Sequence, residues 1–307
     1  MSDLMTAVTI TRFGDAAELR PTTVPRPEPG PGEVRVQVRA AGVQPVDLAV
    51  RAGKGPPNAP VALPLVLGNE FAGTVDAVGA GVAEVAVGDE VLGFATFGSY
   101  AEYRLISSDQ VVRKPVGMPW EVAGSFTAGA QTATIAVEAL AVAAGETFLV
   151  HAGAGAVGAM AVQLARLRGA TVIATAREVN HDYLRSLGAI PVEYGDGLVD
   201  RVRAAAPNGV DVVLDAAGVA AIRASIDLGV DRDRIGTIVA WQEAAELGVR
   251  RLVGVRSARR LAALVGLYDT GLLRTHVRSV YPLADAAAAH REVETGHGRG
   301  RVVLVTG

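Results

Sequence analysis

Cysteine is absent from this sequence of 307 residues. Without a thiol the chain can form no disulfide, and it offers no thiolate to a zinc ion, an iron–sulfur cluster or a substrate. Positive charge is not in excess either, since 29 Lys and Arg stand against 32 Asp and Glu, giving a net charge of −3. Because general nucleic-acid binders and proteins held on anionic membranes depend on clustered positive charge, this balance argues against both classes.

Long hydrophobic runs are also missing. No stretch of about 18 apolar residues occurs, and Asp3 stands where a signal peptide needs positive charge. We therefore expect a cytoplasmic protein with no membrane anchor. Half of the residues are nevertheless apolar, so the chain can bury a core in two domains of roughly 150 residues or in one large α/β domain.

The residue pattern changes near residue 120. Before it, alternating apolar residues such as Val34, Val36 and Val38, together with frequent Pro and Gly, predict short β-strands. The segment 51–64 holds four prolines and two glycines and is expected to be an exposed loop, of the kind that often borders a binding site. After residue 120, Ala-rich helical runs alternate with short apolar strands, which predicts a parallel sheet.

Residues 147–176 form the clearest unit, a strand, a glycine turn, a helix and a second strand. In the helix, Val157, Met160, Ala161 and Leu164 share one apolar face that should pack on the sheet. Further elements are expected as helix 181–187 with Asn180 as its cap, strand 190–194, helix 198–206, strand 210–215 and helix 257–272. The apolar last strand, 301–305, should pair with the first domain.

The glycine turn at 153–158, Gly-Ala-Gly-Ala-Val-Gly, fits the dinucleotide-binding pattern GxGxxG. It follows a strand and opens a helix, where backbone N–H groups such as those of Ala156 and Val157 and the helix dipole can meet a pyrophosphate. Gly153 would permit the tight turn, Gly155 the close approach of the phosphates, and Gly158 the packing of helix on strand. The alternative is an ordinary turn in a chain rich in Ala and Gly.

The end of the second strand distinguishes NAD from NADP, because an acidic side chain there would bind the 2′-hydroxyl of NAD and repel the 2′-phosphate of NADP. The strand 171–176 ends without an acid, and Arg177 follows. Its guanidinium can form charge-assisted bonds to a phosphate; alternatively, Arg177 is a surface residue paired with Glu178. The missing acid and this arginine favour NADP over NAD.

Several motifs in a fixed order carry a family resemblance. They are AAGVQPVDLAVRAG (40–53), LGNEFAGTVDAVG (67–79), GDEVLGF (88–94), GSYAEY (98–103), VHAGAGAVGAMAVQLARLRGATVIATA (150–176) and GRGRVVLVTG (298–307). Together they resemble the medium-chain dehydrogenase/reductase superfamily, specifically its zinc-free quinone oxidoreductase branch, over essentially the whole chain. Several independent motifs in the right order are far more specific than one GxGxxG.

The resemblance implies an α/β protein of two domains and a small-molecule substrate. A GroES-like catalytic β domain would comprise residues 1–122 and 277–307, and an inserted Rossmann domain would comprise residues 123–276. NADP(H) would bind in the cleft between them. A homodimer is the usual state in this family.

Metal ligands of the zinc-dependent relatives are missing. Those alcohol dehydrogenases hold zinc through a Cys in a GVC-type motif and a His in a GHE motif, and the corresponding residues here are Gln44 and Asn69. The five histidines show no close metal-ligand pair and are interpreted as structural or surface residues, at positions 151, 181, 276, 290 and 297. We expect no metal, and without a Lewis acid to hold an alkoxide, quinones or conjugated enones are the expected substrates.

Three site residues are carried over from the family by position. Gln44 replaces an Asn near the nicotinamide, and its amide either bonds the cofactor or substrate carbonyl or caps a turn. Thr132 matches a threonine that faces the cofactor, although a helical threonine can also bond its own backbone. Tyr194 resembles a tyrosine beside the adenosine ribose, and its ring is otherwise part of the core.

The nicotinamide half is expected at the carboxyl edge of the Rossmann sheet, where ligands of such sheets lie. Ala217, Gly218 and Ala240 should flank it there, and Trp241 should narrow the substrate pocket.

The predicted function is transfer of hydride from NADPH to a quinone or an enone, driven by positioning and electrostatics. The sequence identifies no catalytic nucleophile and no proton donor. A second hypothesis is an NADP(H)-binding, redox-responsive regulatory protein with little turnover, and a third is a dedicated enoyl reductase. The only basic cluster is interpreted as a solvated helical face in preference to an anion site, and its members are Arg250, Arg251, Arg256, Arg259 and Arg260.

Overall fold

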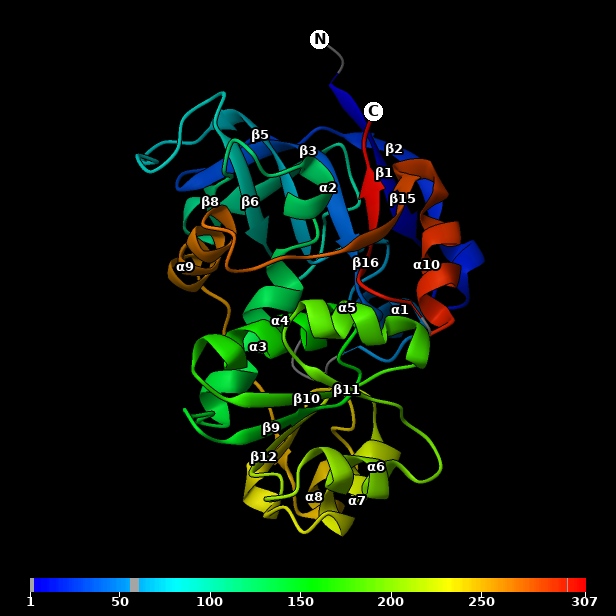
Figure 1. Cartoon of the computed structure of the whole chain (residues 1–307). Helices are drawn as coiled ribbons and strands as arrows, with labels where there is room; N and C mark the ends of the chain where they lie inside the picture. Colours follow the sequence, from blue (N-terminus) through cyan, green and yellow to red (C-terminus); the bar gives the residue numbers. More distant parts are fainter. Residues whose placement is uncertain (1–2, 56–60, 297) are drawn as a thin grey trace. The chain divides into compact units, whose positions relative to one another are not determined.

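Two compact units make up the chain in the computed structural model, which describes residues 3–55, 61–296 and 298–307 (Figure 1). Unit 1 consists of Met1–Ala128, Arg256–Thr270 and His276–Gly307, and unit 2 of Gly129–Val255 and Gly271–Thr275. The chain thus passes between the units four times. The domain boundaries expected at 123 and 276 stay a prediction, because compactness does not by itself define a family domain.

Unit 1 is built on a seven-stranded, mostly antiparallel sheet in the order β15-β16-β3-β5-β6-β8, with β7 paired to β3. Its strands are β3 (Glu33–Val43), β5 (Glu70–Val78), β6 (Glu90–Phe94), β7 (Tyr103–Ser107), β8 (Val111–Arg113), β15 (Val277–Pro282) and β16 (Arg301–Val305). A smaller sheet has the order β2-β1-β4, formed by β1 (Leu4–Ile10), β2 (Arg20–Pro25) and β4 (Leu65–Val66). Val34, Val36 and Val38 are all buried, which confirms the predicted β periodicity.

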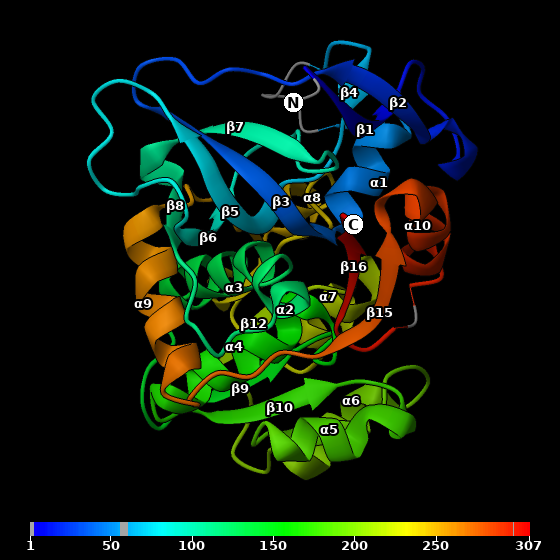
Figure 2. The same cartoon turned by 90° about the horizontal axis from the view of Figure 1, so that it is seen from above.

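The last strand pairs as predicted. β16 lies antiparallel to β3 and parallel to β15, so the end of the chain completes the sheet of unit 1 (Figure 2). The helices of this unit are α1 (Pro45–Arg51), α2 (Trp120–Ala123), α9 (Ala258–Asp269) and α10 (Ala286–Glu294), with short 3-10 turns η1 (Ala16–Glu18), η2 (Ser108–Gln110) and η5 (Leu283–Asp285). Helix α10 packs on β15 and β16.

The predicted exposed loop at 51–64 needs a correction at its start. Arg51 is the last residue of α1 and is buried, because its guanidinium bonds to groups inside unit 1. The residues after it, Ala52 to Lys54, are exposed as expected. Residues 56–60, which include three of the prolines, lie outside the described residues.

Unit 2 is a parallel six-stranded sheet in the order β11-β10-β9-β12-β13-β14. The strands are β9 (Thr147–Val150), β10 (Thr171–Thr175), β11 (Ile190–Val192), β12 (Val212–Asp215), β13 (Ile235–Thr237) and β14 (Arg250–Arg251). The helices are α4 (Ala156–Leu167), α5 (His181–Ser186), α6 (Leu198–Ala205), α7 (Val219–Asp227) and α8 (Ala244–Leu247), with 3-10 turns η3 (Glu178–Asn180) and η4 (Arg232–Arg234). This arrangement confirms the predicted α/β class with a doubly wound parallel sheet.

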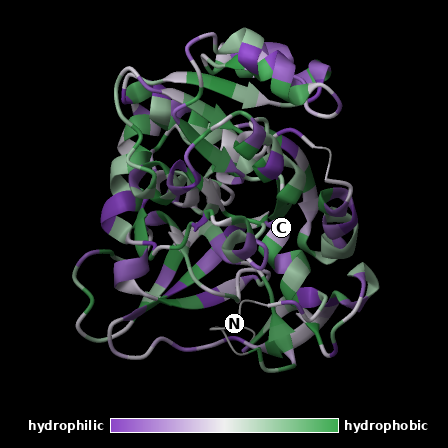
Figure 3. Ribbon diagram, turned by 90° about the horizontal axis from the view of Figure 1, so that it is seen from below, coloured by the Kyte–Doolittle hydropathy of each residue, from purple (hydrophilic) through white to green (hydrophobic). Residues whose placement is uncertain are grey.

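The core of unit 2 follows from its apolar strands and helix faces. Met160, Ala161 and Leu164 of α4 are buried, and the helix packs on β9 and β10 as predicted. Figure 3 shows the alternation of hydrophobic and hydrophilic residues along the ribbons. Asn180 stands at the start of α5, but its side chain makes no capping hydrogen bond, in contrast to the prediction.

Two helices depart from the sequence-based grouping. Helix α3 (Thr127–Ala139) begins in unit 1 and continues into unit 2. Helix α9, expected among the Rossmann elements, is part of unit 1, packs on β8, and is capped by the Ser257 hydroxyl, which accepts the N–H of Arg260. None of the helices within the described ranges is long and apolar enough to cross a bilayer.

The basic cluster is not one helical face. Arg250 and Arg251 are exposed on β14, whereas Arg259 and Arg260 belong to α9. Arg256 is only partly exposed, and its Nη1 donates to Asn69 Oδ1 at 3.1 Å. The interpretation as a solvated helical face is therefore wrong, because the five arginines lie on a strand, on the segment after it and on a helix.

Candidate functional site

Two of the three turn glycines are explained by packing inside unit 2. A Cβ on Gly153 would lie 2.7 Å from the Cβ of Ala174, a residue of the neighbouring strand β10. A Cβ on Gly158 would lie 2.8 Å from the Cα of Gly153 and closer still to the carbonyl oxygen of Ala152. These close approaches hold the first turn of α4 against the end of β9.

Gly155 has no such packing requirement. It is the residue that caps α4, its φ of −74° suits any residue, and an added Cβ would meet only the Ala152 carbonyl oxygen, at 3.3 Å. The helix starts at Ala156 and Val157, and the N–H groups of a first helical turn have no carbonyl four residues earlier within the helix. A glycine that packing requires less than its two neighbours in the motif, at the positive end of a helix, fits a pyrophosphate.

His151, which precedes this turn, is held by hydrogen bonds to neighbouring elements of unit 2. It is 1% exposed, its Nε2 lies 2.9 Å from Ser225 Oγ of α7, and its Nδ1 lies 3.4 Å from Thr175 Oγ1. Thr175 Oγ1 also accepts the N–H of Ala152 at 3.2 Å. Burial lowers the pKa of His151 to about 4, so the ring is neutral at physiological pH and its role here is structural.

A buried carboxylate shapes the sheet edge where the nicotinamide half is expected. Asp215, the last residue of β12, accepts the N–H groups of Ala217 and Gly218, each at 2.8 Å. Its other oxygen accepts the Thr237 hydroxyl at 2.7 Å, and Thr237 Oγ1 in turn accepts the N–H of Ala240 at 3.0 Å. Burial raises the pKa of Asp215, and these donors oppose that rise. One network therefore holds all three predicted edge residues.

Asp215 and Thr237 are functional candidates that the sequence reasoning missed. The available signal was a carboxylate and a hydroxyl at the ends of two short apolar strands. Each is completely buried, and each directs backbone groups at the carboxyl edge of the sheet.

Trp241 follows Ala240 on the same edge and is partly buried. The Arg251 guanidinium lies 5.8 Å from the centre of its ring, within the range of a cation–π contact. Its indole Nε1 is buried without a hydrogen-bond acceptor among the described residues. The role of Trp241 in narrowing the substrate pocket stays a prediction.

Arg177 and Tyr194 are the residues predicted for the adenosine end of the cofactor. Arg177 is exposed directly after β10 and precedes η3. Tyr194 is 47% exposed beyond the end of β11, so the alternative of a core ring is wrong. A cavity of about 550 Å³ lies beside them, between η3, β11 and α6, and is lined by Glu178, His181, Pro191, Val192, Glu193, Arg201, Ala204 and Ala205.

Gln44 in unit 1 is buried at the start of α1, 6% exposed. Gln44 and Asp47 form a capping box at the start of this helix, and Gln44 Nε2 donates to Glu70 Oε1. Its backbone N–H donates to Asp47 Oδ2 at 2.9 Å. Of the two interpretations left open, the capping box supports capping of a turn, and contact with a ligand stays a prediction.

Glu70 is the centre of this buried polar group. Its Oε2 accepts the N–H of Ala128 at 2.6 Å, and a Cβ on Gly42 would lie 2.8 Å from its Cδ. Burial raises the pKa of Glu70, and the charges of Arg301 and Arg256 act in the opposite direction. The glycine in the early Gly-Val-Gln motif is therefore required by the carboxylate of the later Gly-Asn-Glu motif.

Gln44 and Asn69, at the positions of the zinc ligands in zinc-dependent relatives, do not form a donor set that suits a metal. The amide nitrogen of Gln44 faces Glu70, and the amide oxygen of Asn69 faces Arg256, so both amides are engaged with charged neighbours. Among the described residues no group of three or more His, Asp or Glu side chains is arranged to hold an ion. His297 lies outside those residues.

Thr132 is half-buried on α3. The alternative for Thr132 was a hydrogen bond from its hydroxyl to the backbone of its own helix. The structure shows such a bond at Thr134, whose Oγ1 donates to the carbonyl of Ala130 at 2.9 Å. Contact of Thr132 with a cofactor stays a prediction.

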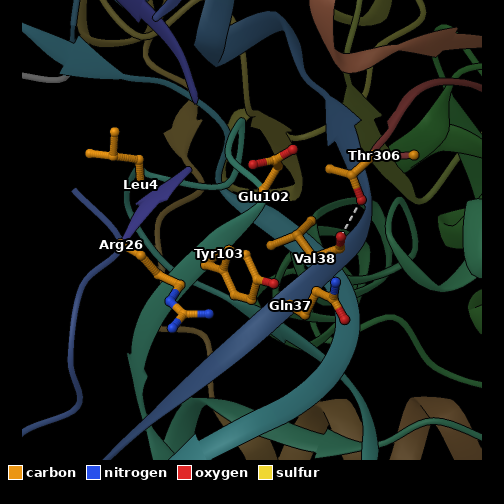
Figure 4. A pocket seen from close by; sticks show the side chains of 8 residues that line it. Leu4, Arg26, Gln37, Val38, Glu102, Tyr103 and Thr306 are labelled. Carbon is orange, nitrogen blue, oxygen red and sulfur yellow. Dashed lines mark hydrogen bonds between the residues drawn. The ribbon is translucent and has the colours of Figure 1, made fainter. Parts of the chain in front are cut away.

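A separate cavity of about 280 Å³ in unit 1 contains none of the predicted site residues (Figure 4). The Arg26 guanidinium lies 5.3 Å from the ring centre of Tyr103 in its wall. The lining residues are Leu4, Arg26, Gln37, Val38, Glu102, Tyr103, Thr306 and Gly307.

Comparison with known proteins adds the family. A profile described as "Alcohol dehydrogenase GroES-like domain" matches residues 30–116, and one described as "Zinc-binding dehydrogenase" matches residues 187–304. The human "Synaptic vesicle membrane protein VAT-1 homolog" is 28% identical, over 99% of this chain and 87% of its own.

Solved structures agree with these matches. The quinone oxidoreductase from Coxiella burnetii is 31% identical, with a TM-score of 0.86 over 98% of this chain and 99% of its own. A mycobacterial protein complexed with NADPH is 30% identical, with a TM-score of 0.85 over 98% of this chain and 100% of its own. These findings confirm the predicted resemblance and fold class: the chain belongs to the medium-chain dehydrogenase/reductase superfamily of NAD(P)-dependent oxidoreductases, in the branch that contains the quinone oxidoreductases.

Proposed function

We propose that this protein is a zinc-independent reductase that uses NADPH to reduce a quinone or an α,β-unsaturated carbonyl compound. The observation that carries the proposal is the glycine turn of unit 2. Gly155 is less constrained by packing than Gly153 and Gly158, it stands at the positive end of α4, and no acid ends the neighbouring strand β10, after which Arg177 follows.

Each part of the cofactor has a proposed partner in unit 2. The pyrophosphate would lie over residues 155–158 at the N-terminus of α4, and the 2′-phosphate would bind Arg177 with Tyr194 beside the ribose. The nicotinamide half would lie along Ala217, Gly218 and Ala240, which the Asp215 network holds in place. Bound NADPH would supply the hydride.

The proposed substrate class is based on the residues at the positions that bind zinc in the zinc-dependent relatives. An amide at Gln44 and an amide at Asn69 provide hydrogen bonds but no Lewis acid, so substrates that accept hydride readily are favoured over alcohols and simple aldehydes. In this proposal Gln44 bonds the substrate carbonyl, and Thr132 and Trp241 line the pocket. Similarity to the Coxiella burnetii quinone oxidoreductase supports the same class.

The test is oxidation of NADPH and of NADH, followed by absorbance, against ortho- and para-quinones, enones and simple aldehydes. We expect turnover of quinones or enones, with NADPH preferred and aldehydes unreactive. An active enone alongside inactive quinones would indicate the enoyl reductase hypothesis. Tight NADPH binding without turnover of any acceptor would reject the reductase and support the regulatory alternative.

Arg177→Glu tests the cofactor preference. A charge-assisted hydrogen bond contributes roughly 1.5–3 kcal/mol, so the dissociation constant of NADPH should rise by roughly 10- to 150-fold while that of NADH changes little. Arg223→Glu, at another exposed position of unit 2, is the matched control and should affect neither cofactor. Equal weakening of NADH and NADPH by Arg177→Glu would refute the role of Arg177.

The homodimer and the cytoplasmic location remain proposals based on family likeness and sequence. Light scattering with the purified chain tests the first, and cell fractionation tests the second.

A further inference from the structure

A buried chain of hydrogen bonds in unit 1 leads from α10 to the backbone of Gln44, through residues that the proposed function does not use. Arg51 Nη1 lies 3.1 Å from His290 Nδ1, and His290 Nε2 lies 3.1 Å from the Tyr100 hydroxyl. Tyr100 donates to Asp47 Oδ2 at 3.1 Å. The same carboxylate oxygen accepts the N–H of Gln44 at 2.9 Å.

The direction of every bond in this chain is fixed by Arg51. A guanidinium can only donate, so His290 Nδ1 must accept, and a neutral His290 then carries its proton on Nε2. That N–H donates to Tyr100, which leaves the single hydroxyl hydrogen of Tyr100 for Asp47. Burial and the charge of Arg51 lower the pKa of His290 to about 3, so the neutral ring is the form present at physiological pH.

The packing around the chain holds these groups in one geometry. Tyr100 and His290 are completely buried, and their rings meet edge to face with centres 5.7 Å apart. Gly68 has φ of +91°, and a Cβ there would lie 2.5 Å from the Tyr100 ring. Arg51 is 3% exposed and also binds the carbonyl of Gly14 and the carboxylate of Glu294.

We propose that His290 is a positioning residue for the reduction: through Tyr100 and Asp47 it fixes the backbone of Gln44 and hence the direction of the Gln44 side chain. This inference rests on the proposed function, in which that side chain bonds the substrate carbonyl. These hydrogen bonds do not relay a proton. A relay would reverse the direction of every bond, and the reversed His290 Nδ1–H would then point at the Arg51 guanidinium.

The proposal predicts a pH dependence, because the chain requires an ionised Asp47. Burial raises the pKa of Asp47 to about 7, the donors Gln44 N–H and Tyr100 OH lower it, and the charge of Glu70 raises it. The other groups that face this region are Arg256, whose charge interacts with Asp47, and the pair of Arg51 with Glu294 beyond His290. kcat with NADPH and an active acceptor should therefore rise as pH increases through about 7.

Variants of the chain test the positioning role. His290→Leu removes the donor to Tyr100, and Tyr100→Phe removes only the hydroxyl, with little risk to folding. Each should lower kcat at pH 7 about tenfold and move the rising limb of the profile to higher pH by about 1 unit, since one hydrogen bond to a charged group has this effect. KM for NADPH should not change. His290→Gln, which keeps an acceptor and a donor, should restore most of the activity.

Nitrogen-15 NMR of His290 provides a readout independent of turnover. We expect the Nε2–H tautomer at pH 7 and no protonation above pH 5. A proton on Nδ1, or titration near the ordinary value, would overturn the bond directions. An active wild type whose pH profile is unchanged by Tyr100→Phe would overturn the positioning role alone. Absence of turnover in the wild type would overturn that role together with the proposed function, while the tautomer result would still stand.

Discussion

Alanine substitutions at two glycines of the same turn separate cofactor binding from packing. At Gly158 the new Cβ would lie 2.8 Å from Gly153 Cα and closer to the Ala152 carbonyl oxygen, and both obstacles are backbone atoms that cannot rotate away. Overpacking of this kind costs roughly 1–3 kcal/mol. Since 1 kcal/mol changes the melting temperature of a domain of roughly 150 residues by about 2–4 °C, Gly158→Ala should lower Tm by roughly 2–12 °C.

Gly155→Ala should behave in the opposite way. Its Cβ would meet one atom at 3.3 Å with an allowed φ, so Tm should change by no more than about 1–2 °C. The methyl group would nevertheless stand where the phosphates approach the backbone, and loss of one charge-assisted bond should raise the dissociation constant of NADPH roughly 10- to 150-fold.

The assay combines thermal unfolding of the cofactor-free protein with NADPH titration by fluorescence. Gly266→Ala in α9 is the control, because nothing lies within 4 Å of the added Cβ. It should preserve the affinity for NADPH, and Tm should stay unchanged or rise by a few degrees, since Ala has a higher helix propensity than Gly. Wild-type affinity in Gly155→Ala would refute the dinucleotide site at this turn. An unchanged Tm in Gly158→Ala would refute the packing argument.

Three further substitutions test the buried polar groups. Thr237→Val removes a donor to Asp215 and should lower the free energy of unfolding by roughly 1–3 kcal/mol in urea titrations; no change would show that the sheet edge does not depend on this bond. Because the pKa of Asp47 is about 7 in the folded protein against an ordinary 3.8, the native chain retains a proton that the unfolded chain has released between these values. The free energy of unfolding should therefore fall as pH rises across that range. Asp47→Asn should make this pH dependence weaker, and an identical slope in the variant and the wild type would contradict the raised pKa of Asp47. Gly42→Ala should destabilise unit 1 because the Glu70 carboxylate occupies that space, and a Tm equal to the wild-type value would contradict this.

Local patterns predicted the parts of the fold that depend on neighbours in sequence. The strand, glycine turn, helix and strand of unit 2 lie within thirty residues, and their order is visible in the residues 147–176. The alternation at Val34, Val36 and Val38 likewise needed only a period of two. The pairing of the last strand with the first domain was predicted because an apolar final strand requires a partner, and the structure pairs it with β3 and β15.

Long-range polar contacts could not be predicted in the same way. Tyr100 lies 53 residues from Asp47 and 190 from His290, and nothing in the local sequence marks the three as bonded. Arg51 was assigned to an exposed loop because the segment that it opens is rich in proline and glycine and has no apolar period, whereas tertiary partners bury Arg51. The five arginines of the basic cluster are close in sequence, but changes of secondary structure distribute them over separate elements.

Hydride transfer itself can be followed with NADPH that carries deuterium at both hydrogen positions of the reactive nicotinamide carbon. After incubation with the enone most active in the acceptor panel, mass spectrometry and NMR locate the label in the product. The proposed function predicts one deuterium on the β-carbon of the reduced enone. An enone product formed without deuterium, or bound NADPH that is oxidised by no enone and no quinone, would contradict it.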